Sequence, residues 1–177
     1  FENVYADIGD DQSILQNLST FSSHMTNIVE ILKHSDPKTF VILDEICAGT
    51  DPIEGSVLAK VIMEKLAEKD VMSTITTHYG ELKALEYTNP YFKNASVEFN
   101  IETLSPTYKL LIGIPGKSNA FEISKKLGVS ADIIDRAKQL LNSDDVKFET
   151  ILKNIYDDKI EIEKEPVKAS CSEHLKD

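Results

Sequence analysis

Two adjacent carboxylates, Asp44 and Glu45, follow an apolar run in the stretch "TFVILDEICAGTDP" at residues 39–52. Such a run is typical of a parallel strand covered on both faces. Open parallel sheets bind ligands at the carboxyl ends of their strands, so both acids stand where a magnesium ion carrying a nucleotide would bind. Asp44 would hold Mg²⁺ through a water, and Glu45 would orient or deprotonate the water that attacks the γ-phosphate. The alternative is two solvated acids that open a loop.

A histidine follows the next apolar stretch, "VMSTITTH", which ends at His78. This stretch predicts a second short buried strand, and a strand–helix–strand order predicts a parallel pair with a right-handed crossover. If the two strands are neighbours, His78 lies beside Asp44. Its imidazole could then hydrogen-bond a γ-phosphate oxygen or the attacking water, although a histidine at a strand end can also serve structure alone.

The segment "GIPGKS" at residues 113–118 ends in the Gly-Lys-Ser of a phosphate-binding loop. That loop needs four residues between its glycines, and here only two separate Gly113 from Gly116. Leu111 occupies the position that the first glycine would need. We therefore interpret Gly116-Lys117-Ser118 as a turn into a helix, and we expect the 177 residues to lack a Walker A loop.

The elements that must position the acids can be assigned from periodicity and caps. We expect loop over residues 1–17 and a helix that begins at Ser19 or Thr20 and ends at Asp36-Pro37. Asp51, followed by proline and by an acid at position 54, starts a second helix that runs to about Lys69. The apolar faces expected for these two helices are Phe21, Met25, Ile28, Val29 and Leu32, and Val57, Leu58, Val61, Ile62 and Leu66.

The second half of the chain shows a different pattern. Residues 94–114 predict a hairpin turning at Ser105-Pro106, with a face formed by Val97, Phe99 and Ile101. Two helices follow, the first capped by Asn119 and stopped at Gly128, and the second capped by Ser130. The second helix should bury Ile133, Ile134, Ala137, Leu140 and Leu141. Residues 142–177 are expected to form a tail with one helix near 146–156.

Composition excludes several classes of protein. The net charge of −11 and the single arginine, Arg136, indicate that these residues repel the phosphates of a nucleic-acid backbone and do not bind it. No apolar run is long enough to cross a membrane, and the N-terminus lacks the pattern of a signal peptide. Cys47 and Cys171 match no metal spacing, so we expect free thiols in the cytoplasm. The missing initiator Met indicates that the chain was cut from something longer.

Taken together, the Asp-Glu strand end, "AGTDP", "TTHY", "LSTFSSHM", "NASVEF" and "LSPTYKLLIGIPGKSNAFEI" resemble the C-terminal half of a MutS-family ATPase domain. The likeness covers roughly residues 1–141 and is stronger to the second bacterial MutS lineage, which lacks the mismatch-reading domain. It implies an α/β fold: a partial P-loop NTPase of the ATP-binding-cassette type with a mainly parallel sheet, flanking helices and a C-terminal helix-turn-helix. The ATPase half would cover 1–116, the helix-turn-helix 117–141 and an acidic tail 142–177.

By this resemblance, Asp44 and Glu45 are the Walker B magnesium and catalytic acids, and His78 is the switch histidine. Gly49, Thr50 and Asp51 resemble the D-loop that faces the opposite subunit. Ser19 and Thr20 begin the signature segment, and Gln12 lies at the Q-loop position. A capped helix N-terminus suits a γ-phosphate, although Ser19 and Asp51 could each be no more than helix caps. This chain has Cys47 where the family usually has glycine, so its side chain could restrict the loop.

The resemblance implies a parent that hydrolyses ATP with Mg²⁺ as a homodimer. It implies coupling to DNA in repair and recombination control, or to ribosomes and RNA, through parts outside this chain, with a nuclease domain often following. The helix-turn-helix would join two subunits. These 177 residues alone would be inactive without a Walker A loop. Two alternatives stay open: a non-catalytic dimerisation or interaction module, and another cassette-class ATPase.

Overall fold

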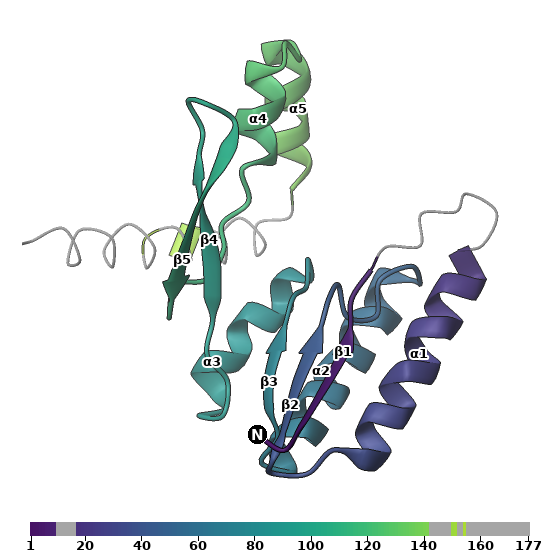
Figure 1. Ribbon diagram of the computed structural model, residues 1–177. Coiled ribbons are helices and arrows are strands. Elements are labelled where there is room, and N and C mark those ends of the chain that lie inside the picture. The colour runs from purple at the N-terminus through teal and green to yellow at the C-terminus, as the bar shows by residue number, and fades with distance from the viewer. Residues whose placement is uncertain (10–16, 142–149, 152–153, 155–177) are drawn as a thin grey trace, which may run out of the picture. The chain divides into compact units, whose positions relative to one another are not determined.

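The computed structural model describes residues 1–9, 17–141, 150–151 and 154, which belong to two compact units, 1–92 and 93–177 (Figure 1). Of the expected tail at 142–177, only residues 150, 151 and 154 are described, so the tail prediction otherwise lies outside the described residues. Gln12 also lies outside them. Among the described helices, none is long and apolar enough to cross a membrane.

Unit 1 is built on three parallel strands in the order β1, β2, β3, with bounds Asn3–Asp7, Thr39–Leu43 and Met72–Ile75. The predicted strand at 39–44 and the parallel pairing are confirmed. The strand predicted at 71–78 covers only Met72–Ile75, and the prediction that it is buried was wrong, because Met72 and Thr74 are exposed. The expectation of loop was wrong for residues 3–7, because β1 pairs with β2 along its whole length and Asp7 stands opposite Leu43, while residues 10–16 lie outside the described residues. Five residues with exposed Val4 and Ala6 carry no recognisable burial pattern, so pairing with β2 defines this strand.

Two helices, α1 (Asn17–His34) and α2 (Pro52–Glu68), cover one face of this sheet. They pack on the face that carries Val41 and Leu43, both of which are fully buried. A short 3-10 turn, Gly80–Ala84, and the short helix α3, Leu85–Thr88, close the core near the end of unit 1. The core is formed by Ile28, Ile31, Val41, Leu43, Ile46, Cys47, Ala59, Ile62, Leu66, Val71, Tyr79, Leu82 and Leu85.

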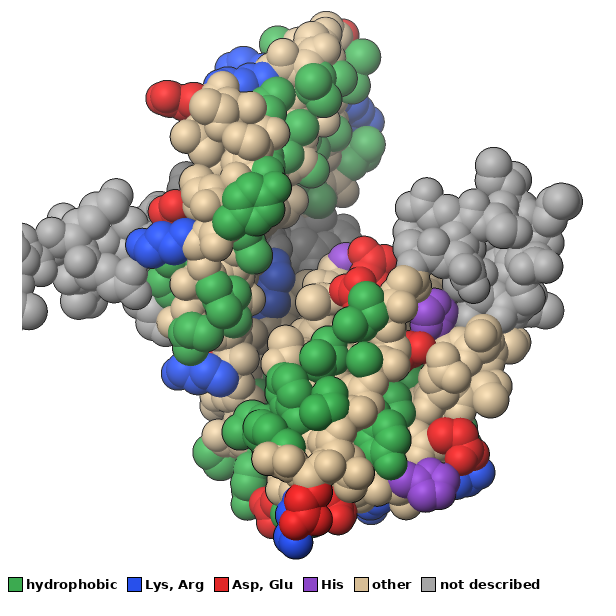
Figure 2. Space-filling view, viewed as in Figure 1, with side chains coloured by type: hydrophobic (Ala, Val, Ile, Leu, Met, Phe, Trp, Pro, Cys, Tyr) green, Lys and Arg blue, Asp and Glu red, His purple; other side chains and the backbone are tan. Residues whose placement is uncertain are grey.

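The opposite face of the sheet is apolar, and no described element of unit 1 covers it. Val4 and Met72 lie on this face with 63% and 57% of their surface exposed, and Phe40 and Ile42 are only partly buried between them. Phe1 stacks on Phe40 with 5.3 Å between ring centroids and stays mostly exposed. Figure 2 looks onto the strands of unit 1 and shows hydrophobic side chains gathered there. Parallel sheets are normally covered on both faces, so half of the covering layer is not supplied by unit 1.

The helix faces differ from the predicted ones. In α2, Ile62 and Leu66 are buried as expected, but Val57 and Val61 are 59% and 55% exposed. The buried side of α2 is made instead by small residues, Gly55, Ser56 and Ala59, which bring the helix close to the sheet and carry little hydrophobic signal. The positions where the prediction was wrong are Val29, Val57, Leu58 and Val61, which are exposed, and Ile31, which is buried.

The start of α1 also differs from the prediction. The helix begins at Asn17, so Ser19 and Thr20 lie inside its first turn and are not its N-cap. Its C-terminal end agrees with the Asp36-Pro37 stop, because the last helical residue is His34. The Lys69 ammonium donates hydrogen bonds to the carbonyl oxygens of Leu32 and Ser35 there. A cation at a helix C-terminus compensates carbonyls that lack a helical partner.

Unit 2 contains the predicted hairpin, formed by β4 (Ala95–Asn100) and β5 (Ser105–Ile112) as a separate antiparallel sheet. The turn lies at 101–104, where Asn100 Oδ1 accepts hydrogen bonds from the Glu102 and Thr103 amides, and not at Ser105-Pro106. Pro106 instead lies in β5, opposite Phe99 of β4. A register shift between Val97 and Phe99 breaks the expected alternation, and Val97 is exposed.

The last described helices are α4 (Ala120–Lys126) and α5 (Ala131–Leu140). Gly128 between them has a φ of +98°, the left-handed conformation predicted for a helix stop. Asn119 and Ser130 precede the two helices as predicted, but neither side chain caps its helix. Of the apolar face expected on α5, only Ile134 is buried, while Ile133, Leu140 and Leu141 are exposed.

Candidate functional site at the carboxyl edge of the sheet

Asp44 and Glu45 follow β2 directly, at the edge where β1 and β3 also end. The Asp44 amide donates to the carbonyl oxygen of Asp7 at 2.9 Å, which continues the β1–β2 pairing. The Thr76 hydroxyl, one residue beyond β3, donates to Asp44 Oδ1 and accepts from the Glu45 amide at 2.8 Å. A single hydroxyl therefore fixes the carboxylate of one acid and the backbone of the other. Both acidic side chains remain exposed.

The backbone after Asp44 makes a tight loop with three left-handed residues. Glu45, Cys47 and Gly49 have φ values of 46°, 58° and 86°. The Ile46 amide donates to the carbonyl oxygen of Thr76 at 3.1 Å, so the loop is also tied to the end of β3. A residue with a Cβ in this conformation costs about 1 kcal/mol or more relative to glycine. Cys47 therefore adopts a conformation that favours glycine, at the expense of some backbone strain.

The Cys47 side chain is only 3% exposed, and burial raises the pKa of its thiol to about 11. Its carbonyl oxygen accepts a 2.8 Å hydrogen bond from the buried hydroxyl of Tyr79, whose pKa burial also raises. Gly55 makes room for this bond, because a Cβ at that position would lie 2.3 Å from the Tyr79 hydroxyl oxygen. The loop is therefore held from β3 by Thr76 and from the following turn by Tyr79.

His78 lies at the same edge of the sheet, three residues past the end of β3. Its ring is exposed and packs against the Tyr79 ring, with 4.6 Å between centroids. The Tyr79 amide donates to the Thr77 hydroxyl at 3.0 Å, which fixes the turn that carries the imidazole. The prediction that the strands of Asp44 and His78 are neighbours is confirmed by the pairing of Leu43 with Ile75.

Asp51 ends the loop and begins α2. Its Oδ1 accepts hydrogen bonds from the Ile53 and Glu54 amides at 3.0 and 3.1 Å, and Pro52 occupies the first helical position. The predicted N-cap is therefore confirmed. The carboxylate is exposed, so a second role towards an opposite subunit stays a prediction.

A buried carboxylate that the sequence did not reveal lies beside Asp44. Asp7, the last residue of β1, is 5% exposed, and both of its carboxylate oxygens have partners on α1. His24 Nδ1 lies 2.7 Å from Oδ2, and Asn27 Nδ2 donates to Oδ1 at 2.9 Å. Asp7 and its two partners are separated by 17 and 20 positions in the sequence, so no local pattern predicts this network. No local pattern predicts the contact between Thr76 and Asp44 either. The "TT" before His78 was the only available hint.

The structure thus brings Asp44, Glu45 and His78 to one edge, with Asp51 at the end of the same loop. Ser19 and Thr20 lie in the first turn of α1, and the structure describes their backbone but not their side chains. Exposed carboxylate oxygens are ligands that suit Mg²⁺, which is bound through one or two carboxylates with substrate phosphates and water. Among the described residues, no group of three or more acidic, histidine or cysteine side chains forms a complete metal cage.

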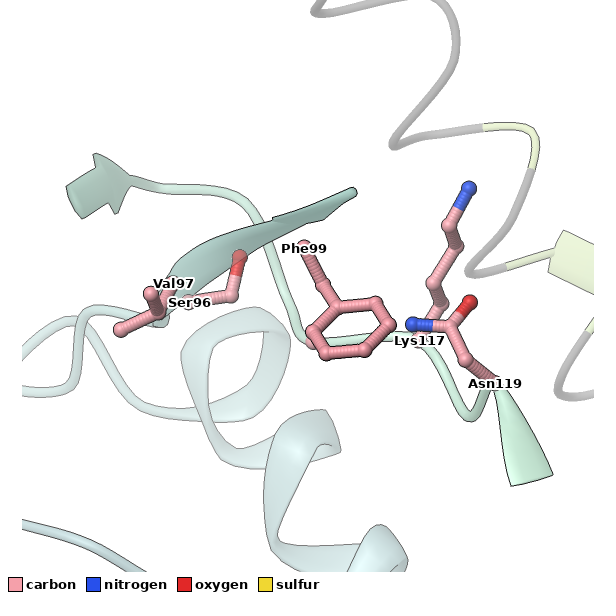
Figure 3. Close-up of a pocket in the computed structure, with 6 residues that line it drawn as sticks. Ser96, Val97, Phe99, Lys117 and Asn119 are labelled. Atoms are coloured by element: carbon pink, nitrogen blue, oxygen red, sulfur yellow. The ribbon is translucent and has the colours of Figure 1, made fainter. Parts of the chain in front are cut away.

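The Gly-Lys-Ser segment lies in unit 2, after the antiparallel strand β5, and does not directly follow a strand of the parallel sheet. Residues 113–119 precede α4 without regular structure, as the predicted turn into a helix requires. Lys117 and Asn119 line, with Ser96, Val97, Phe99 and Gly116, a cavity of about 40 Å³ (Figure 3). That volume holds a water molecule or two and is too small for a nucleotide phosphate chain. The predicted turn into a helix agrees with the structure, and the expected lack of a Walker A loop stays a prediction.

Comparison with known proteins matches residues 1–144 to the family described as MutS domain V. The chain belongs to the MutS family. It is 59% identical over 155 residues to "Endonuclease MutS2" of Acetivibrio thermocellus, 57% to that of Alkaliphilus oremlandii and 56% to that of Staphylococcus aureus. Each match covers 88% of this chain and 20% of the relative. The chain therefore spans about a fifth of the length of these MutS relatives, and its resemblance to the second MutS lineage is confirmed.

Proposed function

We propose that these residues form the C-terminal half of an ATPase domain in a MutS2-type protein that hydrolyses ATP as a homodimer. The observation that carries the proposal is the pair Asp44–Glu45 at the carboxyl edge of a parallel sheet, fixed by Thr76 and neighboured by His78, in a MutS-family chain. The uncovered apolar face and the open edge of β3 support it, since both fit further strands and helices of one domain.

In this proposal each residue has one task. Asp44 would hold the magnesium ion through a water, and Thr76 orients its carboxylate. Glu45 positions the attacking water and accepts its proton, while His78 donates a hydrogen bond to the γ-phosphate or the water. The bound Mg²⁺ supplies charge compensation for the phosphates. Gln12, Ser19, Thr20 and Asp51 contact nucleotide or the opposite subunit, as the MutS resemblance implies.

The whole protein would act on DNA, and its relatives carry the name endonuclease. We infer that nucleic acid, whether DNA or ribosomal RNA, is bound by other parts of the protein, because the −11 charge of these residues repels phosphate backbones. A cytoplasmic location follows from this proposed activity. The second candidate, a non-catalytic dimerisation module, is favoured by Ile133, Leu140 and Leu141, which are exposed together on α5.

The deciding experiment uses the whole MutS2-type protein, with a phosphate-binding loop, beside the 177-residue chain. We expect only the former to bind Mg-ATP tightly and to turn it over. Glu45→Gln should keep Mg-ATP binding and abolish turnover, because the amide cannot accept the proton of the attacking water. Glu68→Gln, an exposed acid on the far end of α2, is the matched control and should change neither. Normal turnover in Glu45→Gln would remove the catalytic assignment of Glu45, and absence of turnover in the unmodified whole protein would favour the dimerisation module.

A further inference from the structure

The buried carboxylate of Asp7 connects two parts of the molecule that the proposed mechanism treats separately. Its backbone carbonyl accepts the Asp44 amide at 2.9 Å, so it is a direct neighbour of the metal-binding acid. Its side chain, 6% exposed, accepts from His24 and Asn27, which stand three residues apart on one face of α1. A single residue therefore joins the carboxylate edge to the helix whose first turn carries Ser19 and Thr20.

The energetics of this contact favour a fixed helix position. A carboxylate out of water is destabilising unless its oxygens are hydrogen-bonded, so loss of either partner leaves a poorly compensated charge. Ile28 and Ile31 of α1 pack into the apolar core, and apolar packing is non-directional, while the Lys69 hydrogen bonds to the Leu32 and Ser35 carbonyls act at the other end of the helix. Two directional bonds at positions i and i+3 restrict both rotation of the helix about its axis and sliding along it. The network therefore determines where the N-terminal turn of α1 stands.

We propose that Asp7, His24 and Asn27 form a positioning network that keeps the signature helix in register with the hydrolytic carboxylates of the same subunit. This inference rests on the proposed function. The MutS resemblance implies that in a dimer the signature helix, here α1, completes the nucleotide site of the partner, whereas Asp44 and Glu45 would serve their own site. The network would then couple the two sites: a displacement at one carboxylate edge moves the helix that closes the other site.

The prediction separates turnover from binding. His24→Ala in the whole protein should lower kcat for ATP by about 10- to 100-fold, the effect of a misplacement near 1 Å. The equilibrium Kd for Mg-ATP should change less than about threefold, because Asp44 keeps its bonds to Asp7 and Thr76. His24→Asn should restore most of the turnover, since its Nδ2 is as many bonds from Cα as the imidazole Nδ1. Lys33→Ala, on the exposed side of the same helix, should leave both quantities unchanged.

A second measurement needs no nucleotide. In the 177-residue chain, hydrogen exchange of α1 amides should rise in His24→Ala and return in His24→Asn, while Ile62 in α2 stays protected. If α1 loosens but kcat stays at the wild-type value, the network serves stability alone and the coupling is wrong. Equal losses in His24→Asn and His24→Ala would also overturn it, because then hydrogen bonding is not the cause. If Glu45→Gln keeps full turnover, the proposed function itself fails, independently of this network.

Discussion

Substitution of Gly55 by alanine offers a quantitative test of how the loop after Asp44 is held. The added Cβ would stand 2.3 Å from the Tyr79 hydroxyl oxygen and 3.1 Å from the Cys47 carbonyl oxygen. The hydrogen bond between these groups, 2.8 Å long, must then break or shift. Loss of a buried bond destabilises by about 1–3 kcal/mol and overpacking by a similar amount, while alanine gains about 1 kcal/mol of helix propensity. The net expectation is a free energy of unfolding lowered by about 3 kcal/mol.

The assay is amide hydrogen exchange at Val41 and Leu43, the buried centre of unit 1, because the two units need not unfold together. A loss of about 3 kcal/mol lowers their protection about 100-fold. Gly80→Ala is the matched control, since nothing lies within 4 Å of the added atom.

A double-substitution cycle separates the steric clash from a general effect of alanine. Tyr79→Phe alone should lose about 1–2 kcal/mol, because the Cys47 carbonyl oxygen loses its buried donor. In Gly55→Ala/Tyr79→Phe the 2.3 Å clash with the hydroxyl is gone and only the 3.1 Å approaches to the Cys47 carbonyl oxygen and to the ring remain, so the pair should cost clearly less than the sum of the two single losses. Additive losses, or a Gly55→Ala chain as stable as the Gly80→Ala control, would refute the argument.

Two further expectations concern the same loop. Asp51→Ala should destabilise α2 by about 1 kcal/mol, because the Ile53 and Glu54 amides lose their hydrogen-bond acceptor. Asp51→Ser keeps an acceptor and should leave the stability of α2 unchanged. Amide hydrogen exchange at Ile62 measures both variants, and equal exchange rates in the two would contradict this expectation. Because the folded pKa of Cys47, about 11, exceeds the ordinary value of 9, the protonated thiol stabilises the fold below pH 9 and this contribution is lost as the pH rises towards 11. In a Cys171→Ser background at pH 8, alkylation should be about 100-fold slower than in urea, and comparable rates would disprove the burial of this thiol.

Much of the site could be predicted because its signals are local. The apolar run before Asp44, the Asp51-Pro52 helix start and the position of His78 after the next strand all depend on a few consecutive residues. Parallel pairing then brings two of these strand ends together whatever the rest of the chain does. The left-handed stop at Gly128 was predictable for the same reason.

The remaining features depend on partners distant in sequence. Strand β1 exists through its pairing with β2, and its own five residues resemble a polar loop. The buried face of α2 is made of glycine, serine and alanine, so hydrophobic periodicity selected Val57 and Val61 on the wrong side. Thr76 and Asp7 are assigned only once the sheet edge is assembled, because hydrogen bonds across 17 to 32 residues leave no mark on local sequence.

The bare side of the three-stranded sheet affects how oligomers of this polypeptide must be interpreted. Val4, Met72 and Phe1 are exposed together on unit 1, and such an exposed hydrophobic patch promotes self-association in concentrated solution. Light scattering could then report pairs that have nothing to do with α5. A dimer measured for these 177 residues should be attributed to α5 only under two conditions. It must persist after Val4 and Met72 are both changed to lysine, and it must disappear after Leu140 is changed to lysine.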